Sequence, residues 1–353
     1  VSNRLSERPI DALPNSGAFG SDKDVPSASM SVYGYVQNTT GQVTTHYVGG
    51  CMTRFGAYPF CNTLDLPSYS WAKSMVAGIA SMRLEKLHPG AMQSKIADYV
   101  PQCKAWKGVT FEHALDMTTG RYTSKVYDVD EASPKSRKFF LANSHKDKIK
   151  AACTMHKRRE APGKTFVYHT TDTYVLGTAI TEYLRQHSDP KGDIFDSLVR
   201  PIFHQIGVSP VALQTRRTYD DIQQPFSGWG LTLHRNDIAL IMNFLQNGGK
   251  AGGQSLLDEV MLRSALQQNP ADRGPKAVID TQRYQNGFWA WNAGPTIGCR
   301  GDKYIPVMSG YGGLSAVLFP NGHSYYYVSD GGAFTWARAA KASNDILPFC
   351  EKK

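Results

Sequence analysis

The chain has 353 residues, of which 41% are hydrophobic, so it can form a globular protein with a sizeable buried core. No run approaches the roughly eighteen apolar residues of a membrane-spanning helix, and we expect no membrane span. The formal net charge of +9 can attract acidic partners such as nucleic acid. Whether it does so depends on where the basic residues lie.

The first part of the chain predicts an arm followed by a β-hairpin. Residues 1–30 are rich in Ser, Pro, Asp and Asn without helical or strand period, so we expect an extended arm over the surface, with regular structure starting near Ser31. Residues 31–36 and 42–48 are rich in Val, Tyr and Thr, and the turn residues 38–41 separate them. This pattern is typical of two paired strands.

A helical region follows. From Ser68 onward Trp71, Met75, Ile79 and Met82 recur every three or four residues, which predicts an amphipathic helix with one face in the core. Between residues 90 and 265, helical stretches such as 172–186 and 235–246 alternate with Gly and Pro loops. We therefore expect a mostly helical lobe over 90–265.

One segment of that lobe carries most of the net charge. Residues 135–160 contain nine Lys or Arg against Asp147 and Glu160, a local charge of +7. The stretch lacks the interleaved aromatic residues of a base-stacking platform. We interpret it as a solvated surface helix and expect no nucleic-acid partner.

The C-terminal part predicts strands again. Residues 314–319 and 324–328 flank the turn 320–322, and a helix is expected over 335–346. Pairing of the two terminal hairpins gives an α/β (α+β) fold: one antiparallel sheet flanked by helices, built from residues 31–89 and 266–353, with the helical lobe 90–265 inserted. A site would then lie between the lobes.

The six cysteines contain no Cys-x-x-Cys pair, which disfavours a zinc ribbon or a thioredoxin-like motif. Their even number favours disulfides, and sequence position suggests 51 with 61, 103 with 153 and 299 with 350, out of about fifteen connectivities. A periplasmic or secreted location follows from this interpretation. Six buried thiols in a cytoplasmic enzyme are the alternative.

Candidate chemistry centres on Ser70 and Lys73. The chain has no Gly-x-Ser-x-Gly, His-Glu-x-x-His, Walker or Gly-x-Gly-x-x-Gly motif. In Ser70-Trp71-Ala72-Lys73 a hydroxyl and an amine share one helix face, and the free N–H groups of a first helical turn favour an oxyanion. Ser188 and Lys191 have the same spacing, but Pro190 between them breaks the helix that would join them.

Several segments resemble the β-lactamase-related serine hydrolases, in the order expected for that family, and the resemblance covers most of the chain. They are residues 66–74, 109–120, 162–177, 228–231 with 247–250, and 310–313. The resemblance implies a penicillin-recognising fold in which Ser70 is acylated and Lys73 and Tyr168 move protons. It also implies an oxyanion hole made by the backbone N–H groups of Ser70 and Leu314.

Two positions depart from the family pattern. The family usually has Tyr-x-Asn where this chain has Tyr168-His169-Thr170, and Lys where this chain has Tyr311. The ammonium that pairs with the carboxylate of a β-lactam is therefore missing, unless Arg300 or Lys303 replaces it. These motifs resemble those of the esterases and the 6-aminohexanoate-dimer amidases of the superfamily. Asp172, four residues after Tyr168, favours the amidases.

These observations predict a serine hydrolase that cleaves a small ester or amide. A β-lactamase or D-Ala peptidase, and a β-lactam sensor that acylates slowly without turnover, remain alternatives. No cofactor is expected, and no metal, because the ten His residues lack ligand spacing. The candidate substrate-binding residues are Tyr311, Gly312, Gly313, Asp172, Trp229 and Trp289. Sequence alone leaves open whether Lys73 or Tyr168 is the general base, the natural substrate, and whether the protein is a monomer or dimer.

Overall fold

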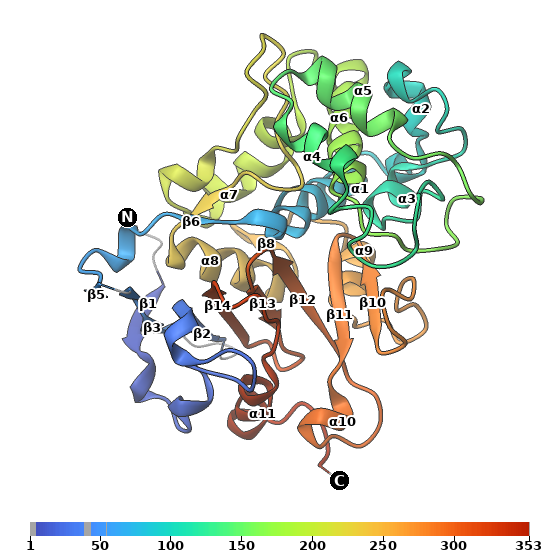
Figure 1. The fold of residues 1–353 in the computed structure, drawn as a ribbon. Coiled ribbons are helices and arrows are strands. Elements are labelled where there is room, and N and C mark those ends of the chain that lie inside the picture. Colours follow the sequence, from blue (N-terminus) through green and yellow to red (C-terminus); the bar gives the residue numbers. More distant parts are fainter. Residues whose placement is uncertain (1–4, 39–43, 54, 353) are drawn as a thin grey trace.

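The computed structural model describes residues 5–38, 44–53 and 55–352, and these form a lobe built on a large sheet and a helical lobe above it (Figure 1). The sheet has eight strands in the order β1-β3-β2-β14-β13-β12-β11-β10, and every neighbouring pair is antiparallel except β1 and β3. Its strands are β1 (Ser6–Pro9), β2 (Met30–Gln37), β3 (Thr45–Gly50), β10 (Gln282–Gln285), β11 (Phe288–Asn292), β12 (Tyr304–Gly310), β13 (Leu314–Leu318) and β14 (Ser324–Ser329). The predicted fold class is confirmed.

The two terminal hairpins meet in the middle of this sheet. β2 pairs with β14, with Tyr35 opposite Tyr325 and Gly34 opposite Tyr326. The predicted strands of both hairpins are present, while the predicted turn over 38–41 lies, apart from Asn38, outside the described residues. Six two-residue strands form three further ladders: β4 (Met52–Thr53) with β5 (Gly56–Ala57), β6 (Leu66–Pro67) with β7 (Thr232–Leu233), and β8 (Lys250–Ala251) with β9 (Gln254–Ser255).

Strands β10 to β12 were not predicted. β10 and β11 are short, and the pair Asn286-Gly287 joins them with positive φ at both residues, 53° and 84°. Asn-Gly is the preferred sequence of such tight hairpin turns, so the signal for this hairpin was present in the sequence.

The helices include the predicted ones at almost the expected bounds. The α-helices are α1 (Ile79–Leu87), α2 (Ile96–Tyr99), α3 (Phe111–Leu115), α4 (Pro134–Leu141), α5 (His145–Thr154), α6 (Thr170–His187), α7 (Arg200–Ile206), α8 (Arg235–Gln246), α9 (Glu259–Ala265), α10 (Gly294–Ile297) and α11 (Ala337–Ile346). The helices predicted over 172–186, 235–246 and 335–346 correspond to α6, α8 and α11.

Alternating residues of the sheet face two separate cores. Tyr326 and Val328 of β14 belong to the larger cluster, which includes the apolar face of α8, whereas Tyr325 and Tyr327 belong to a second cluster with α11. This is the period of two that a strand buried on both faces requires. Gln246 at the end of α8 also donates to the carbonyl oxygens of Phe319 and His323. Helix α8 therefore packs on the sheet, although we had placed it in the helical lobe.

The N-terminal segment is part of the fold rather than a bare arm. Ser6–Pro9 forms β1, an edge strand parallel to β3. Phe19 is buried beside the α11 face of the sheet, and its carbonyl oxygen accepts a hydrogen bond from the Tyr325 hydroxyl. Regular structure thus begins well before Ser31, because scattered apolar residues without period can still bury themselves on a preformed sheet.

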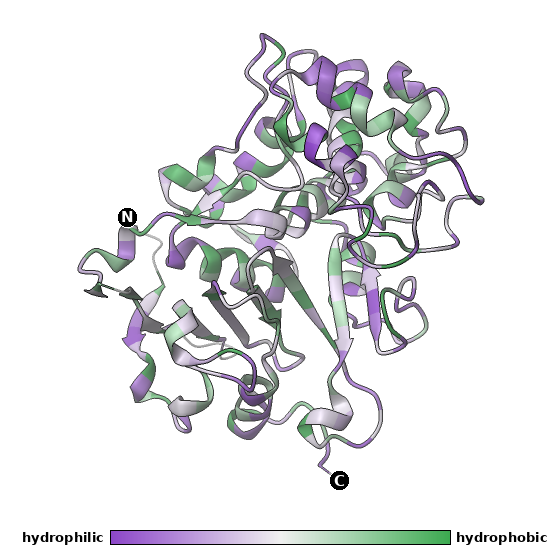
Figure 2. Cartoon of the chain, in the orientation of Figure 1, coloured by the Kyte–Doolittle hydropathy of each residue, from purple (hydrophilic) through white to green (hydrophobic). Residues whose placement is uncertain are grey.

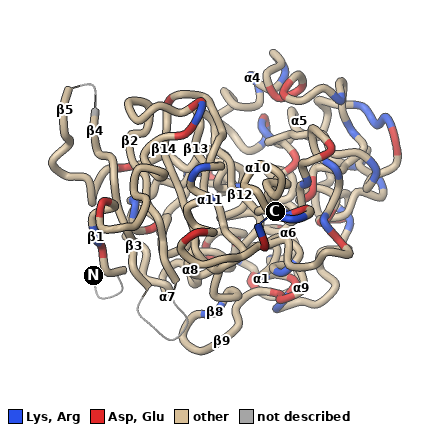
Figure 3. Tube along the Cα trace, turned by 90° about the horizontal axis from the view of Figure 1, so that it is seen from below, with Lys and Arg blue, Asp and Glu red and all other residues tan. Residues whose placement is uncertain are grey.

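The predicted disulfide pairing is confirmed: Cys51 is bonded to Cys61, Cys103 to Cys153, and Cys299 to Cys350. The basic segment forms two helices, α4 and α5, and continues past the end of α5. Figure 2 shows many hydrophilic residues in this outer part of the helical lobe, and Figure 3 shows charged residues along α4 and α5. Lys148 is an exception, since it is buried and donates to the carbonyl oxygens of Phe139 and Phe140. No helix among the described residues is long and apolar enough to cross a bilayer.

Candidate active site

Ser70 lies at the start of a helical segment held between the two lobes. The segment begins as a tight turn over Tyr69–Trp71, continues as a π-helical stretch over Lys73–Gly78, and becomes α1. The Trp71 indole donates to the Met308 carbonyl oxygen of β12 at 3.0 Å, and the Ser74 hydroxyl donates to the Gly287 carbonyl oxygen at 2.6 Å. These two bonds fix the segment on the sheet, and π-helical stretches of this kind frequently occur at functional sites.

The residue before Ser70 has an unusual backbone conformation. Tyr69 has a φ of +41°, in the left-handed region that a bulky side chain seldom adopts. Its neighbour Ser68 is buried, its backbone N–H donates to the Leu231 carbonyl oxygen at 3.0 Å, and its hydroxyl accepts from the Leu231 N–H at 3.2 Å. These contacts hold the sharp turn that presents the Ser70 side chain.

Lys73 connects Ser70 to the neighbouring elements. Its ammonium donates to Ser70 Oγ at 2.9 Å, to Thr170 Oγ1 at 2.8 Å and to the Gly228 carbonyl oxygen at 3.3 Å, so all three protons have acceptors. The side chain is 2% exposed. Burial lowers the pKa of Lys73 to about 8, although the charge of Glu131 acts in the opposite direction.

Tyr168 completes the predicted trio. Its ring centroid lies 4.8 Å from Lys73 Nζ, and its ring stacks on Trp289 with centroids 5.8 Å apart. Burial and the nearby Glu131 carboxylate raise the pKa of Tyr168 well above its ordinary value, while a hydrogen bond with Ser70 opposes this shift. The structure thus brings Ser70, Lys73 and Tyr168 together, with the phenol protonated at neutral pH.

The turn between β12 and β13 lies beside the start of this helical segment. Leu314 on β13 is paired with Gly310 on β12. A Cβ added to Gly310 would lie only 3.1 Å from the Ser68 carbonyl oxygen, so this strand end passes close to the residues before Ser70. Gly312 and Gly313 have φ of +87° and +100°, which explains why glycine is required there. Tyr311 is 76% exposed, and its ring lies 5.8 Å from that of Tyr69.

Glu131 is a site residue that sequence reasoning missed. One carboxylate oxygen accepts from the Thr170 backbone N–H at 3.0 Å, and the other accepts from the Thr170 hydroxyl. Thr170 therefore links Lys73 to Glu131. The segment around Glu131 is polar and has no periodic pattern, so no signal in the sequence marked it.

A buried charge cluster lies directly behind Thr170. His169 Nε2 is 3.1 Å from Asp130 Oδ2, and His169 Nδ1 is 3.6 Å from Asp172 Oδ2. Although burial opposes the charged ring, the two carboxylates raise the pKa of His169 to about 9. Asp172 is 2% exposed, and its carboxylate also accepts from the Thr119 hydroxyl. The structure therefore places this candidate substrate-binding residue in an internal ion pair.

Three residues of this region have the composition of a metal site, since ligand atoms of Asp130, His156 and His169 lie within 4.8 Å of one another. The rings of His156 and His169 are stacked, however, with centroids 4.5 Å apart and an angle of 9° between their planes. Ligand lone pairs lie in the plane of each imidazole, so two stacked rings do not direct them at one ion. The geometry fits an ion pair better than a metal centre.

This ion pair predicts a pH-dependent stability. A His whose pKa is raised in the folded state stabilises the protein below its unfolded pKa, and this contribution is lost as the pH rises through the folded value. For His169 the contribution is present below about pH 6.5 and is lost up to about pH 9. We expect His169→Gln to lower the free energy of unfolding by about 3 kcal/mol at pH 6 and to flatten its decline between these pH values.

Urea unfolding of both proteins at several pH values measures this effect. His156→Gln is the matched control, since burial, together with the charge of His169, lowers the pKa of His156 to about 4 and leaves that ring neutral across the window. Equal pH dependence in His169→Gln and the parent protein would contradict the assigned charge.

Comparisons with known proteins agree with this geometry at the level of the fold. No family model and no curated protein sequence matches the chain. Among solved structures, a protein of Bacillus anthracis assigned as a 6-aminohexanoate-dimer hydrolase is similar with a TM-score of 0.64 and 15% identity, over 98% of this chain and 86% of its own. A penicillin-binding protein homologue of Caulobacter crescentus has a TM-score of 0.62 and 18% identity, over 91% and 94%. A family VIII carboxylesterase has a TM-score of 0.62 and 15% identity, over 91% and 93%.

This is the β-lactamase-related, penicillin-recognising serine hydrolase fold. Because all three identities are low, the comparisons establish the fold and leave the particular activity to the residues of this chain.

The family pattern has a Lys at the position of Tyr311. In this fold neither Arg300 nor Lys303 lies where it could replace that cation. Lys303 lies just before β12, at the end of the strand remote from Gly310, and its backbone N–H donates to the Asn292 side chain. Arg300 is 72% exposed and its nearest carboxylate is that of Glu351, at 4.0 Å. Six residues of strand separate this end from Gly310, a distance of about 20 Å, so neither side chain pairs with a substrate at Ser70.

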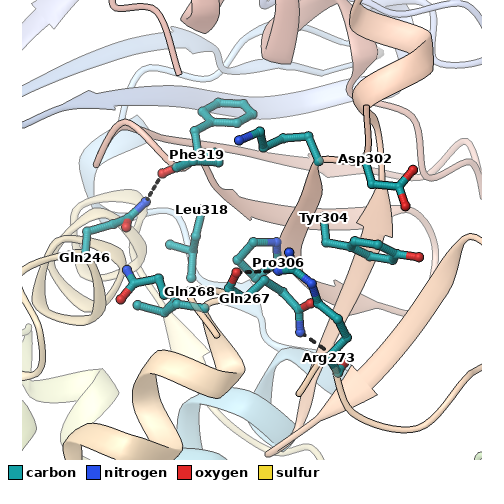
Figure 4. A pocket seen from close by; sticks show the side chains of 12 residues that line it. Gln246, Gln267, Gln268, Arg273, Asp302, Tyr304, Pro306, Leu318 and Phe319 are labelled. Carbon is teal, nitrogen blue, oxygen red and sulfur yellow. Dashed lines mark hydrogen bonds between the residues drawn. The ribbon is translucent and has the colours of Figure 1, made fainter. Parts of the chain in front are cut away.

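Two cavities flank the sheet of this fold. One of about 160 Å³ lies at that remote end, between α8 and β12, and its lining includes Gln246, Gln267, Arg273 and Tyr304 (Figure 4). The other, of about 270 Å³, adjoins Tyr168 and is lined mainly by apolar side chains. Its lining residues are Lys125, Val126, Tyr127, Asp128, Asp130, Phe166, Val167, Tyr168, Ala277 and Val278. Of these two cavities, the second borders the site, through Tyr168.

Of the predicted aromatic residues, Trp289 is at the site and Trp229 is beside it. Trp289 stacks on Tyr168, whereas Trp229 packs against Phe139, Phe140 and Phe226 with ring centroids 4.4 to 5.6 Å apart. Trp229 follows Gly228, whose carbonyl oxygen accepts from Lys73. Its aromatic cluster therefore supports the wall that holds the ammonium.

Proposed function

We propose that this protein is a serine hydrolase that cleaves ester or amide bonds through an acyl-enzyme on Ser70. The observation that carries the proposal is the 2.9 Å hydrogen bond between Ser70 Oγ and the ammonium of Lys73, whose side chain is buried. A hydroxyl joined to a buried amine is the arrangement that nucleophilic catalysis requires. The shared fold with esterases and with penicillin-binding proteins supports the same reaction class.

In the proposed cycle, Ser70 Oγ attacks the substrate carbonyl carbon while its proton passes to the neutral amine of Lys73. The lowered pKa of Lys73 favours it as the base, and the raised pKa of Tyr168 favours the phenol as a proton donor to the leaving group. Backbone N–H groups of Ser70 and Leu314 stabilise the oxyanion. Water then attacks the acyl-enzyme and gives a proton to the Tyr168 phenolate, while Lys73 returns its proton to Ser70 Oγ as that oxygen leaves.

The substrate is proposed to be small and to lack a carboxylate next to the scissile bond. Tyr311 replaces the cation that would bind such a group, and the cavity beside Tyr168 has mainly apolar walls, including Tyr127, Phe166 and Val278. An apolar acyl or alcohol moiety fits these walls. β-Lactam hydrolysis is accordingly the weaker alternative.

The natural location is proposed to be extracytoplasmic. Three disulfides are the basis for this, because such bonds persist in oxidising compartments. The exposed basic residues of α4 and α5 are proposed to be a solvated surface without a nucleic-acid partner.

A parallel kinetic comparison tests the substrate class. We expect measurable turnover of p-nitrophenyl butyrate, with kcat/KM at least about 100-fold above that for a chromogenic cephalosporin, a difference of about 2.7 kcal/mol. A linear N-acyl p-nitroanilide in the same assay measures amide cleavage. Preferred turnover of the cephalosporin, or acylation by it without turnover, would overturn the proposed ester or amide class.

A further inference from the structure

A continuous hydrogen-bond chain leads from Ser70 through Lys73 and Thr170 to Glu131. Lys73 Nζ donates to Ser70 Oγ and to Thr170 Oγ1, and the Thr170 hydroxyl donates in turn to a carboxylate oxygen of Glu131. The Thr170 backbone N–H binds the second carboxylate oxygen at 3.0 Å. Thr170 thus binds both carboxylate oxygens of Glu131 and holds the carboxylate next to its own hydroxyl. The hydroxyl proton therefore points at Glu131.

We propose that Glu131 is a positioning residue that acts through Thr170 and takes the extra proton of Lys73 before Ser70 attacks. The proton moves from Lys73 Nζ to Thr170 Oγ1 while the Thr170 hydroxyl proton moves to Glu131. Neutral amine and neutral carboxylic acid result, with no bond between heavy atoms formed or broken. The amine then accepts the Ser70 proton. This inference rests on the proposed hydrolase function.

The surroundings of Lys73 favour this transfer. The ammonium is buried, and its pKa of about 8 would still leave most of it charged at neutral pH. A relay to Glu131 supplies the neutral amine without release of a proton to water, because a hydrogen-bonded pair can share one proton. The other titratable groups facing the chain are Tyr168 beside Lys73, and Tyr127 and His169 beside Glu131.

The segment that carries Glu131 is itself held in place. The adjacent Asp130 accepts from the backbone N–H groups of Thr123 and Ser124 at 2.7 and 3.1 Å, and from His169 at 3.1 Å. Although burial opposes it, these bonds lower the pKa of Asp130 to about 2, so the carboxylate stays charged. The buried ion pair thus sets the position of Glu131 relative to Thr170.

The pH dependence of kcat/KM for p-nitrophenyl butyrate tests the relay. With the relay, attack does not require loss of a proton from the Lys73–Glu131 pair, so we expect the parent rate to stay level across neutrality. In Glu131→Gln and Thr170→Val we expect the rate at pH 7 to fall by up to about 10-fold, because about a tenth of Lys73 is neutral at this pH without the relay. Their rates should recover only on the alkaline side of neutral, where Lys73 itself loses its proton. Thr170→Ser keeps a hydroxyl and should keep the parent profile.

The opposite shift would overturn the relay. Glu131 raises the pKa of Lys73, so a purely electrostatic role predicts that Glu131→Gln moves the acid limb to lower pH and speeds the reaction at pH 7. An unchanged profile would equally overturn it. Asp147→Asn, which removes an exposed carboxylate on α5, is the charge control.

If Glu131→Gln fails to fold, the Thr170→Val and Thr170→Ser pair decides the question alone. Failure of the hydrolase proposal itself is recognised separately, because parent activity would then survive Ser70→Ala.

Discussion

Ser70→Ala is expected to lower kcat for p-nitrophenyl butyrate by about 10⁴-fold or more, because the substitution removes the atom that forms the acyl-enzyme. The fold should be unaffected, since the Ser70 side chain makes its hydrogen bonds only with catalytic partners, Lys73 and Tyr168, among those described. Steady-state kinetics with thermal unfolding of the same samples measure both effects.

The chain provides its own control for this variant. Ser188 has a Lys three residues later, as Ser70 does, but it lies just past the end of α6 and its hydroxyl faces the Leu184 carbonyl oxygen. Ser188→Ala should therefore keep the parent rate. A Ser70→Ala protein that retains more than about a tenth of the parent rate would contradict the nucleophile assignment.

Lys73→Ala is expected to lower kcat/KM by about 10³-fold, because Ser70 then lacks the amine that accepts its proton. The same substitution leaves the Thr170 hydroxyl and the Gly228 carbonyl oxygen without their buried donor, so we also expect a loss of about 1–3 kcal/mol in stability. Lys73→Arg should not restore the rate, since a guanidinium stays protonated.

Lys191→Ala is the matched control, because Lys191 belongs to the second Ser-x-x-Lys sequence. It shows whether loss of any Lys lowers the rate or only loss of Lys73. Lys191 is an exposed loop residue, and its removal should leave both kcat/KM and stability unchanged. Near-parent activity in Lys73→Ala would shift the role of base to Tyr168.

Much of the fold could be predicted because its signals are local. The period of three to four residues from Trp71 to Met82 marked the nucleophile segment, and the turn residues between β13 and β14 marked the last hairpin. The burial of Phe19 and the placement of α8 on the sheet were missed, because they depend on contacts between segments distant in sequence.

The site divides in the same way. Ser70, Lys73 and Tyr168 belong to motifs with recognisable spacing, and they meet as expected. Glu131 reaches Thr170 from a polar segment almost forty residues earlier, and no spacing rule connects the two positions. Asp172 lies within a motif, yet the ion pair with His169 turns it inward, which only the three-dimensional structure reveals.

The central claim is that Ser70 becomes covalently modified. Incubation with a fluorophosphonate, followed by intact-mass measurement and peptide mapping, tests it most directly. We predict one adduct per chain, on the peptide that contains Ser70, formed in Ser188→Ala and absent in Ser70→Ala. An adduct on another residue, or no adduct in a folded parent protein, would contradict the account.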